Sequence, residues 1–502
     1  MSGLRPNRRL KIHVATTYFK FQCNRKAVLP CGYSIRQFVQ SNLREVDWDY
    51  RAHRYILSAD YSIYEVRSGS VVMPRYFLSK FIKFLENNHI SYKLSRKRPV
   101  PPRFIELKMN KKFELREEQA PLARFLTDPD HWFKPLSSQT GSGKTVVTEY
   151  AITQLGVATI IILGGLIDQW YKSILEFIDI DKADIYVIKG FESLDTLWKM
   201  FRNGYRPKII LWSTRTLALY AVNQSYPSLP DYKSFLKEFG IGLAIVDECH
   251  LNFNTNVLID LKTNIKYRIY LSATYQRSNP QGRRIFDTVF PKKLRFGEQF
   301  LKKYTEVTVL SYHLGILPQD LPKFKVAKGY LHALYERYLR KKKTVFRSFI
   351  SNVMDPIIRT YYLDKKKDGQ KLLILCKTKL FAIQLHDRLQ YLFPGMKTTV
   401  YFSGDKEYGG LDKLESEVIV STQSSAGTGT DIKKLKTCIN TVSFASAPLA
   451  AQSLGRLREL PGEPTYYIDI YNPEITQHSY HVEARIEIYK ERAAKYHIST
   501  LC

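Results

Sequence analysis

Short runs of apolar, β-branched residues recur along most of the chain, separated by stretches with helical spacing. Between about residues 105 and 300 these runs are apolar at every position, as in the strands of a parallel sheet covered on both faces. A similar set returns after about residue 370, so the pattern predicts two α/β domains. The runs are TIIIL, KIILWST, LAIVDE and YRIYLSAT in the first domain, and KLLILC, TTVYFSG, EVIVST, INTVSFA and TYYIDIY in the second.

The first 95 residues follow a different pattern, in which strand-like and helical stretches are mixed. Asp49–Val66 alternates Tyr and Ile with polar residues, which predicts paired strands, and Pro74–Ile90 has Phe residues near helical spacing. The basic, proline-containing stretch Lys93–Phe104 is typical of a link between domains. We therefore expect a small α+β N-terminal domain at 1–95, a first α/β domain at 96–300, a helical and basic connecting region at 301–365, and a second α/β domain with a C-terminal helix at 366–502.

The charge of the chain narrows the class of partner. It has 77 Lys and Arg against 47 Asp and Glu, a net charge of +30. Such an excess is self-repulsive in a compact protein, so we expect an anionic partner, with nucleic acid first because neutralised phosphates release counterions. A membrane is not expected: there is no basic amphipathic helix and no lipidation signal, and Val157–Ile167 is shorter than the ~20 residues of a membrane span. The six scattered cysteines lack metal-ligand spacing and the N-terminus lacks a secretory signal, which predicts reduced thiols and a cytoplasmic location.

The strongest local signal is a glycine-containing loop before a predicted helix, SQTGSGKTVVTEYAI, Ser138–Ile152. Gly141 and Gly143 allow backbone N–H groups to approach a phosphate closely, because glycine has no Cβ. Lys144 is placed to reach the β- and γ-phosphates of a nucleotide, and Thr145 to place its hydroxyl on Mg²⁺. The usual first glycine of this phosphate-binding pattern is replaced here by Ser138, and a simple turn before a helix is the alternative interpretation.

A second signal follows a buried strand, in LAIVDECH, Leu243–His250. A strand that ends in two acids delivers carboxylates to a rigid position, where Asp247 would bind Mg²⁺ and Glu248 would polarise the water that attacks the γ-phosphate. Cys249 and His250 suggest a metal-thiolate site instead, but no second pair of ligands is spaced to complete one.

The order and separation of QTGSGKT, DECH and LSAT resemble motifs I, II and III of superfamily 2 helicases. This resemblance implies two RecA-like domains with ATP and Mg²⁺ between them, and the similarity extends over about residues 105–475. It also assigns roles to further residues of the first domain. These are ATP-loop residues Thr140, Gly141, Ser142 and Gly143; adenine-reading residues Arg116 and Gln119; nucleic-acid contacts Gln169, Trp170, Thr214 and Thr216; and residues that couple hydrolysis to domain movement, His250, Ser272 and Thr274.

In the second domain, AGTGTDIK resembles motif V and QSLGRLRE resembles motif VI. The former would supply Gly427 to nucleic acid, and Gly429 and Asp431 to ATP. In motif VI the usual pattern is QxxGRxxR, and Gln452 and Arg456 match it. The final arginine position holds Glu459, with Arg458 one residue earlier. The arginine that stabilises the transferring phosphoryl group is therefore Arg456 or Arg458.

The DECH sequence, the small size and the N-terminal domain resemble phage recombination helicases of the UvsW type. In those helicases the small N-terminal domain resembles a double-stranded nucleic-acid-binding fold, so the resemblance implies that residues 1–95 bind DNA and recognise the substrate. That resemblance implies remodelling of forks or Holliday junctions in recombination, replication and repair, by a protein that we expect to be monomeric and that would act alongside recombination or replication proteins. Three alternatives stay open: an RNA helicase, the motor of a restriction or nuclease system, and a DNA-binding scaffold with a degenerate ATPase. The intact Lys144, Asp247 and Glu248 speak against the scaffold.

Overall fold

The strands predicted from the apolar runs form two parallel sheets in the structure, which is a computed structural model. It describes residues 10–22, 32–49, 54–65, 70–111, 113–137, 143–222, 226, 228–272, 275, 280–297, 303–326, 329–403, 405–426 and 432–501. The chain divides into two units. The first contains residues 1–138 and 142–299, and the second contains residues 300–502 with 139–141.

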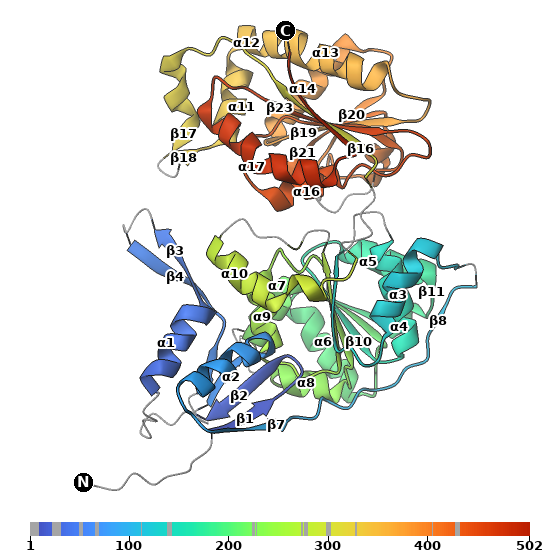
Figure 1. Ribbon diagram of the computed structural model, residues 1–502. Helices are drawn as coiled ribbons and strands as arrows, with labels where there is room; N and C mark the ends of the chain where they lie inside the picture. Colours follow the sequence, from blue (N-terminus) through green and yellow to red (C-terminus); the bar gives the residue numbers. More distant parts are fainter. Residues whose placement is uncertain are drawn as a thin grey trace. The chain divides into compact units, whose positions relative to one another are not determined.

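The first unit is built around a six-stranded sheet whose strands all run parallel (Figure 1). Both faces are apolar: Ile161 and Leu163 pack into one core, whereas Ile160 and Ile162 pack into another. This burial explains why TIIIL has no polar alternation. In spatial order the strands are β12 (Ile185–Ile188), β13 (Ile209–Ser213), β10 (Thr159–Leu163), β14 (Leu243–Val246), β15 (Tyr267–Ser272) and β9 (Phe133–Ser137).

Helices cover both faces of this sheet. One face packs against α3 (Ala120–Thr127), α4 (Lys144–Leu155) and α5 (Ile167–Phe177). The other packs against α6 (Phe191–Arg202), α8 (Tyr232–Glu238), α9 (Phe253–Asp260) and α10 (Pro280–Val289). Smaller elements of this part are α7 (Thr214–Leu217), the strand pair β8 (Lys108–Met109) and β11 (Ile178–Asp179), the 3-10 helices η2 (Glu117–Gln119), η3 (Lys182–Asp184) and η5 (Lys292–Leu294), and the π-helical turn η4 (Ala218–Val222).

The N-terminal part of the same unit forms a separate, mixed sheet of five strands, in which Phe19 and Phe21 face helix α2. The ring of Phe81 on α2 lies 5.3 Å and 4.9 Å from those two rings, so aromatic packing joins helix and sheet. The strands in spatial order are β5 (Ile63–Glu65), β6 (Ser70–Pro74), β2 (Tyr18–Gln22), β1 (Leu10–Val14) and β7 (Tyr92–Arg96), accompanied by α1 (Gly32–Leu43), the hairpin β3 (Arg44–Asp49) and β4 (Arg54–Asp60), η1 (Arg75–Phe77) and α2 (Leu78–Asn87).

This N-terminal part packs directly on the first parallel-sheet domain. The Thr17 hydroxyl donates to the carbonyls of Asp260 and Thr263, at 2.8 Å and 2.6 Å, and residues of both parts belong to one continuous apolar core. The segment after β7 also follows the domain closely: the backbone N–H groups of Val100 and Arg103 donate to carbonyls of Asn264 and Gly240. The predicted linker is therefore held along its length.

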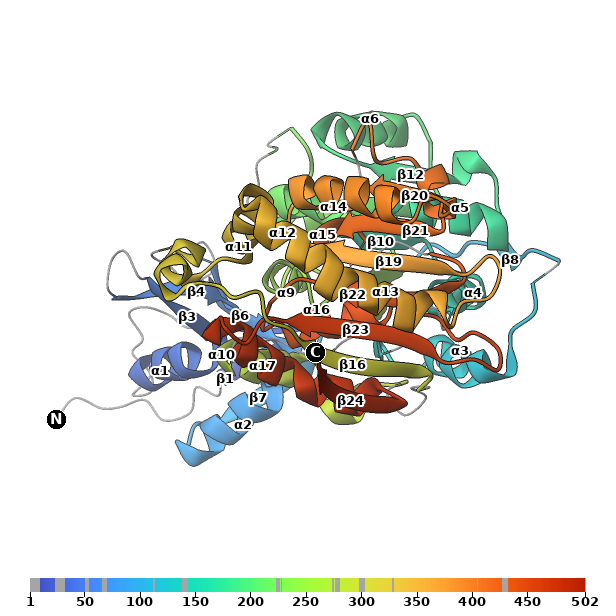
Figure 2. The same cartoon turned by 90° about the horizontal axis from the view of Figure 1, so that it is seen from above.

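The second unit contains a seven-stranded parallel sheet, whose strands Figure 2 shows side by side. One of them, β16 (Thr305–Ser311), comes from the region expected to be a helical connection. In spatial order the strands are β20 (Thr398–Tyr401), β21 (Val418–Thr422), β19 (Lys371–Cys376), β22 (Leu435–Asn440), β23 (Thr465–Tyr471), β16 and β24 (Lys495–Thr500).

Helices also cover both faces of the second sheet. One core contains residues of α11 (His332–Lys341), α12 (Lys343–Ser348), α13 (Asp355–Ile358) and α14 (Lys379–Leu392), and the other contains residues of α15 (Gln423–Ala426), α16 (Ala447–Leu454) and α17 (Thr476–Arg492). The remaining elements are the π-helical turns η8 (Phe349–Met354) and η9 (Arg359–Leu363), the 3-10 helices η7 (Pro318–Phe324) and η10 (Leu411–Glu415), and the hairpin β17 (Lys325–Val326) and β18 (Gly329–Tyr330).

The fold class predicted from the sequence is confirmed: two parallel-sheet α/β domains follow a small α+β part. One strand is displaced from its expected place, since INTVSFA contributes only its first two residues to β22. The strand ends at Asn440 because its amide donates to the carbonyl of Val442, a local bond that competes with the sheet. Among the helices that the structure describes, none has the length and apolarity needed to cross a membrane.

Candidate active site

The loop predicted to bind phosphate joins β9, which ends at Ser137, to α4, which begins at Lys144. Residues 138–142, with the predicted site residues Thr140, Gly141 and Ser142, lie outside the described residues. Gly143 precedes Lys144 and Thr145, the first residues of α4, with a φ of +82°, a left-handed conformation that favours glycine. The sequence thus places glycine where the chain turns into the helix.

Two side chains expected to read the adenine lie against this glycine. A Cβ on Gly143 would lie 2.0 Å from Nε2 of Gln119 and 3.0 Å from Nη2 of Arg116, so those two side chains would have to move to admit one. Gln119 is buried, and its Oε1 accepts a hydrogen bond from the backbone N–H of Arg116 at 3.1 Å. The structure therefore brings Arg116 and Gln119 to the start of the loop's helix.

The acids of DECH lie at the same edge, where β14 ends. Lys144 Nζ is 3.9 Å from Oδ1 of Asp247 and 3.6 Å from Oε1 of Glu248. Glu248 has a φ of +46°, which is uncommon for a residue with a side chain and marks the abrupt turn after the strand. In a parallel sheet the carboxyl ends of all strands lie at one edge, which is where ligands bind in such folds. Residues a hundred positions apart in the sequence therefore meet here.

The charges of these three groups shift one another's pKa values. Burial acts to lower the pKa of Lys144, but Glu248 and Asp247 outweigh it and raise the pKa, so the amine stays protonated. Burial raises the pKa of Asp247, which Lys144 opposes and Glu248 reinforces. One cation between two carboxylates leaves an acidic site beside the N-terminus of α4. Such a site suits Mg²⁺ with a nucleotide, so the residues fit the predicted cofactors.

Trp170 occupies a different position from the one expected. It was predicted to contact nucleic acid, but it is only 2% exposed and its indole Nε1–H donates to Oδ2 of Asp247 at 2.8 Å. The other carboxylate oxygen, Oδ1, accepts the backbone N–H of Glu248 at 2.9 Å. Two donors therefore fix the orientation of the Asp247 carboxylate. No sequence signal pointed to this pair, which are separated by 77 positions.

The coupling residues that the structure describes also meet. Nδ1 of His250 lies 2.8 Å from the Ser272 hydroxyl and 3.3 Å from Oε2 of Glu248. Burial lowers the pKa of His250, with Glu248 opposing the shift. A neutral imidazole thus links the acid of motif II to the end of β15. The third coupling residue, Thr274, lies outside the described residues.

The remaining nucleic-acid residues of the first domain differ in exposure. Gln169 is exposed on α5, as a backbone contact requires. Thr214 and Thr216 are buried, and the Thr216 hydroxyl accepts the backbone N–H of Gly190 at 2.9 Å. Thr216 therefore uses its hydroxyl within the domain.

The motif VI residues belong to the second unit. Gln452 lies in α16, and Arg456 follows that helix; both are buried, whereas Arg458 is partly exposed. Arg456 lies near the Cys438 thiol, whose pKa is raised by burial and lowered by the arginine. The motif V residues Gly427, Gly429 and Asp431 lie outside the described residues.

A metal-thiolate centre finds no support around DECH. Cys249 is fully buried, and burial raises the pKa of its thiol. Among the residues that the structure describes, no group of three or more His, Cys, Asp and Glu side chains is placed to hold a metal ion. A single carboxylate with a hydroxyl, completed by nucleotide phosphates and water, is the arrangement in which proteins commonly bind Mg²⁺.

Comparison with known proteins places this geometry in context. No family model and no curated protein matches the sequence. Among solved structures, T4 UvsW is 14% identical, with 98% of this chain and 99% of that one covered and a TM-score of 0.36. The ATP-dependent Type ISP restriction-modification enzyme LlaBIII bound to DNA is 12% identical, with a TM-score of 0.51 over 84% of this chain. The match covers 34% of that enzyme, so this chain spans about a third of its length. The likeness to LlaBIII, over 84% of this chain, shows that the two share a fold.

Proposed function

We propose that the protein is an ATP-dependent superfamily 2 DNA helicase or translocase that remodels branched DNA, by branch migration or unwinding, in recombination, replication and repair. The observation that carries the proposal is the convergence of Lys144, Asp247 and Glu248 at the carboxyl edge of one parallel sheet. An amine beside a helix N-terminus and two adjacent acids are what hydrolysis of a nucleotide requires. A scaffold would not need these groups together.

The chain's own residues divide the work of hydrolysis. Lys144 would hold the β- and γ-phosphates, and Thr145 with Asp247 would hold Mg²⁺, which when bound supplies positive charge against the phosphate oxygens. Glu248 would orient and deprotonate the attacking water. Trp170 keeps the Asp247 carboxylate directed toward the site through its 2.8 Å bond.

Further residues would couple ATP hydrolysis to domain movement and would complete the nucleotide site. His250 and Ser272, 2.8 Å apart, would carry the state of the nucleotide to the end of β15. Gln452 and one of Arg456 and Arg458 would act on the nucleotide from the second domain, together with Gly429 and Asp431. These roles are implied by the motif resemblance.

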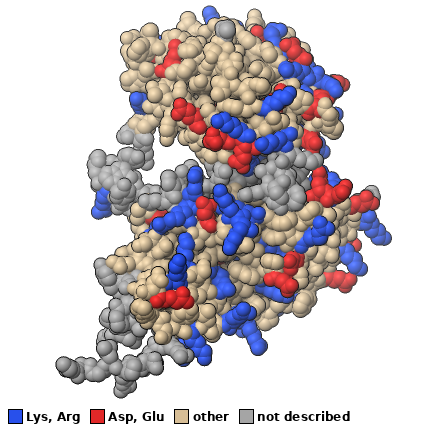
Figure 3. Space-filling view, viewed as in Figure 1, with Lys and Arg blue, Asp and Glu red and all other residues tan. Residues whose placement is uncertain are grey.

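DNA is the partner that the charge favours. Lys and Arg side chains outnumber acidic ones over the face shown in Figure 3, in keeping with the net charge of +30. Phosphate contacts by such side chains give sequence-independent binding, which a motor moving along DNA requires. Exposed Gln169 would be one contact with the backbone, and the protein would act in the cytoplasm, of a bacterial host if it is encoded by a phage.

The likeness to LlaBIII supports a second candidate, the motor of a restriction-modification system, because 84% of this chain matches about a third of that enzyme. A four-way junction assay separates the two. Labelled junction with ATP should be converted to duplex arms by the wild-type protein, and not by Lys144→Ala. Failure of the wild type to resolve the junction, with ATP turnover stimulated by linear duplex alone, would favour the restriction motor.

A further inference from the structure

One face of the N-terminal sheet is basic across three adjacent strands. Side chains of a strand alternate between faces, and the pairing register places His13 opposite Lys20 on β2 and beside Ser95 on β7. The same register places Lys11 beside Lys93. None of the side chains on this side of β1, β2 and β7 is acidic. They are Lys11, His13, Tyr18, Lys20, Gln22, Lys93 and Ser95, together with Lys97, which directly follows β7. We call this surface the basic face.

The charged side chains of the basic face remain accessible because the other side of the sheet forms the core, whereas Tyr18 is buried beside Val72 and Leu261. Phe19, Phe21, Ile12 and Val14 point away from it and are buried, with the first two packed on Phe81 of α2. In contrast, Lys11, His13, Lys93 and Lys97 are exposed and Lys20 is half-buried. The solvent face of a half-buried sheet normally carries polar residues of mixed charge. A row of charged residues that are all basic is therefore unusual and points to an anionic ligand.

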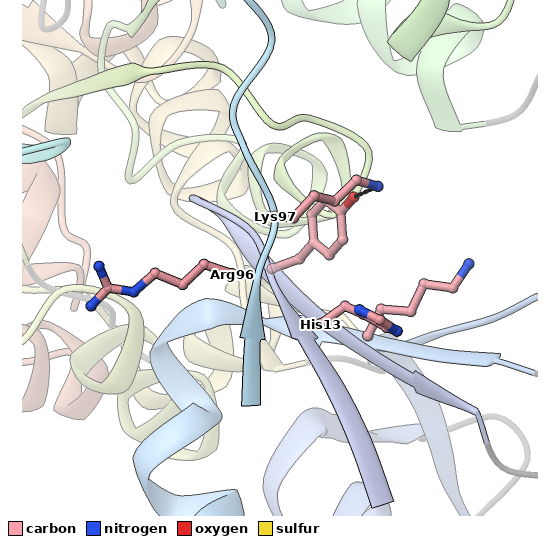
Figure 4. Close-up of a pocket in the computed structure, with 5 residues that line it drawn as sticks. His13, Arg96 and Lys97 are labelled. Carbon is pink, nitrogen blue, oxygen red and sulfur yellow. Dashed lines mark hydrogen bonds between the residues drawn. The ribbon is translucent and has the colours of Figure 1, made fainter. Parts of the chain in front are cut away.

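A pocket lies at one end of the basic face, lined by His13, Tyr18, Lys20, Arg96 and Lys97 (Figure 4). Lys97 Nζ donates to the Tyr18 hydroxyl at 3.2 Å, which fixes the amine over the pocket. In Figure 4 the labelled side chains of His13 and Lys97 lie on the same side of β7, whereas that of Arg96 extends to the opposite side. The pocket is therefore formed mainly by the basic face itself.

A further lysine lies near the pocket but does not line it. Lys233 stands on α8 of the parallel-sheet domain, where partial burial and the positive charges of Lys97 and Lys20 lower its pKa, against an opposing effect of Tyr18. Asp231, the acid at the start of α8, accepts bonds from the backbone N–H groups of Lys233 and Ser234. Ammonium groups this close repel one another, and an anion between them would remove that cost.

We propose that the basic face, with Lys233, binds consecutive phosphates along one strand of duplex DNA. The spread of the charges favours a chain of phosphates over a single anion. From the level of Lys93 to that of Lys97 a strand rises about 13 Å, at about 3.3 Å per residue. One strand of duplex DNA rises ~3.4 Å along the axis per phosphate and also winds around it, so neighbouring phosphates lie roughly twice as far apart as that rise and about two or three would lie along the face.

The proposal rests on the proposed function, since it names the surface by which a DNA motor would grip duplex outside its motif-bearing site. It also joins two parts of the first unit in one contact: strands of the N-terminal sheet supply Lys20 and Lys97, and helix α8 supplies Lys233. Because those parts share a core, the grip would be rigid with respect to the first parallel-sheet domain.

The test is the salt dependence of duplex binding by the full chain, with Lys20, Lys97 and Lys233 all changed to Gln. The matched control changes Lys83, Lys182 and Lys199 to Gln. These three are exposed in the same unit, and the first lies on α2, on the covered side of the sheet. The probe is a fluorescent 30-base-pair duplex titrated between 50 and 200 mM salt, with thermal midpoints compared for all three proteins.

Each lost phosphate contact lowers the slope of log affinity against log salt by about 0.9. Loss of three contacts therefore predicts a slope shallower by about 2.7, so that the variant loses roughly 40-fold less affinity than the wild type over this salt range. The control should keep the wild-type slope. An unchanged slope in the basic-face variant, or an equal change in the control, would overturn the proposal.

Two further readouts separate this proposal from others. ATP turnover saturated with single-stranded DNA should be unchanged in the basic-face variant; if the wild type shows no DNA-stimulated turnover at all, the proposed function fails instead. Inorganic phosphate, added at constant ionic strength, should not displace duplex from the wild type. Displacement that is lost in the basic-face variant would identify a small-anion site and contradict the assignment to a DNA backbone.

Discussion

The replacement Trp170→Phe tests the structure most sharply, because sequence and structure give Trp170 different roles. As a nucleic-acid contact it would control DNA affinity. As a buried donor, 2.8 Å from Oδ2 of Asp247, it would control the acid that is expected to bind Mg²⁺. Phe keeps the aromatic ring and removes the indole N–H, so the change is directed at that hydrogen bond.

The size of the effect follows from the bond that is lost. A hydrogen bond to a charged group contributes about 1.5–3 kcal/mol, and this one is shielded from water. If the carboxylate needs that orientation in the transition state, turnover at fixed Mg²⁺ falls roughly 10- to 150-fold. The backbone N–H of Glu248 still donates to Oδ1, so Asp247 keeps one of the two donors and some activity should remain.

The assay measures ATP turnover at saturating DNA as a function of Mg²⁺, together with DNA affinity by fluorescence anisotropy. Trp170→Phe should need more Mg²⁺ and turn over more slowly, while DNA affinity stays within about twofold of wild type. Gln169→Ala is the matched neighbour: exposed on the same helix, it should weaken DNA binding and leave the Mg²⁺ dependence unchanged. The shift in Mg²⁺ dependence distinguishes positioning of Asp247 from a loss of stability, which large-to-small changes also cause.

Two results would refute this reasoning. The first is a Trp170→Phe protein whose turnover and Mg²⁺ dependence match the wild type. The second is a protein whose DNA affinity falls while its Mg²⁺ dependence is preserved, because that would return Trp170 to the nucleic-acid surface.

Three further changes follow from the site and its surroundings. Glu248→Gln should slow ATP turnover by about 10²–10⁴ while ATP binding persists, and rapid turnover would remove Glu248 as the base. Of Arg456→Ala and Arg458→Ala, one should slow hydrolysis by about 10³ or more; if neither does, the interpretation of motif VI is wrong. Burial raises the pKa of Glu149 on α4 from 4.5 to about 8, so the free energy of unfolding should fall as pH rises from about 4.5 to about 8, by roughly 3 kcal/mol at pH 7. Glu149→Gln should remove that loss in denaturation measured at pH 5 and pH 8, whereas exposed Glu192→Gln should keep it; equal pH dependence of wild type and Glu149→Gln would contradict the shift.

Much of the fold was predictable because burial on both faces leaves a strong local pattern. TIIIL and LAIVDE are strands for that reason, and their place at adjacent positions of one sheet follows from parallel α/β topology. The pattern was weaker where local bonds compete, as at Asn440, which ends β22 early. It also missed Thr305–Ser311, a strand whose partner β23 lies 160 positions further along the chain.

The site residues were predictable from the sequence where neighbouring residues determine the geometry, and were not predictable where distant parts of the chain meet. Gly143 and Lys144 were predictable, because loop geometry and chemistry are encoded in neighbouring residues. The bond from Trp170 to Asp247 depends on the placement of α5 against the end of β14, which no short motif records. The basic face was hidden in the same way: its lysines are dispersed over the first hundred residues, and only the strand register brings them together.

The central claim is that branched DNA stimulates ATP hydrolysis at the site formed by Lys144, Asp247 and Glu248. Its most direct test is ATP turnover measured with single-stranded DNA, duplex DNA, a four-way junction and RNA of equal length, with Lys144→Ala as the control. The account predicts that DNA stimulates turnover, the junction most strongly, and that Lys144→Ala abolishes it. Stimulation mainly by RNA, or turnover in Lys144→Ala close to that of the wild type, would contradict the account.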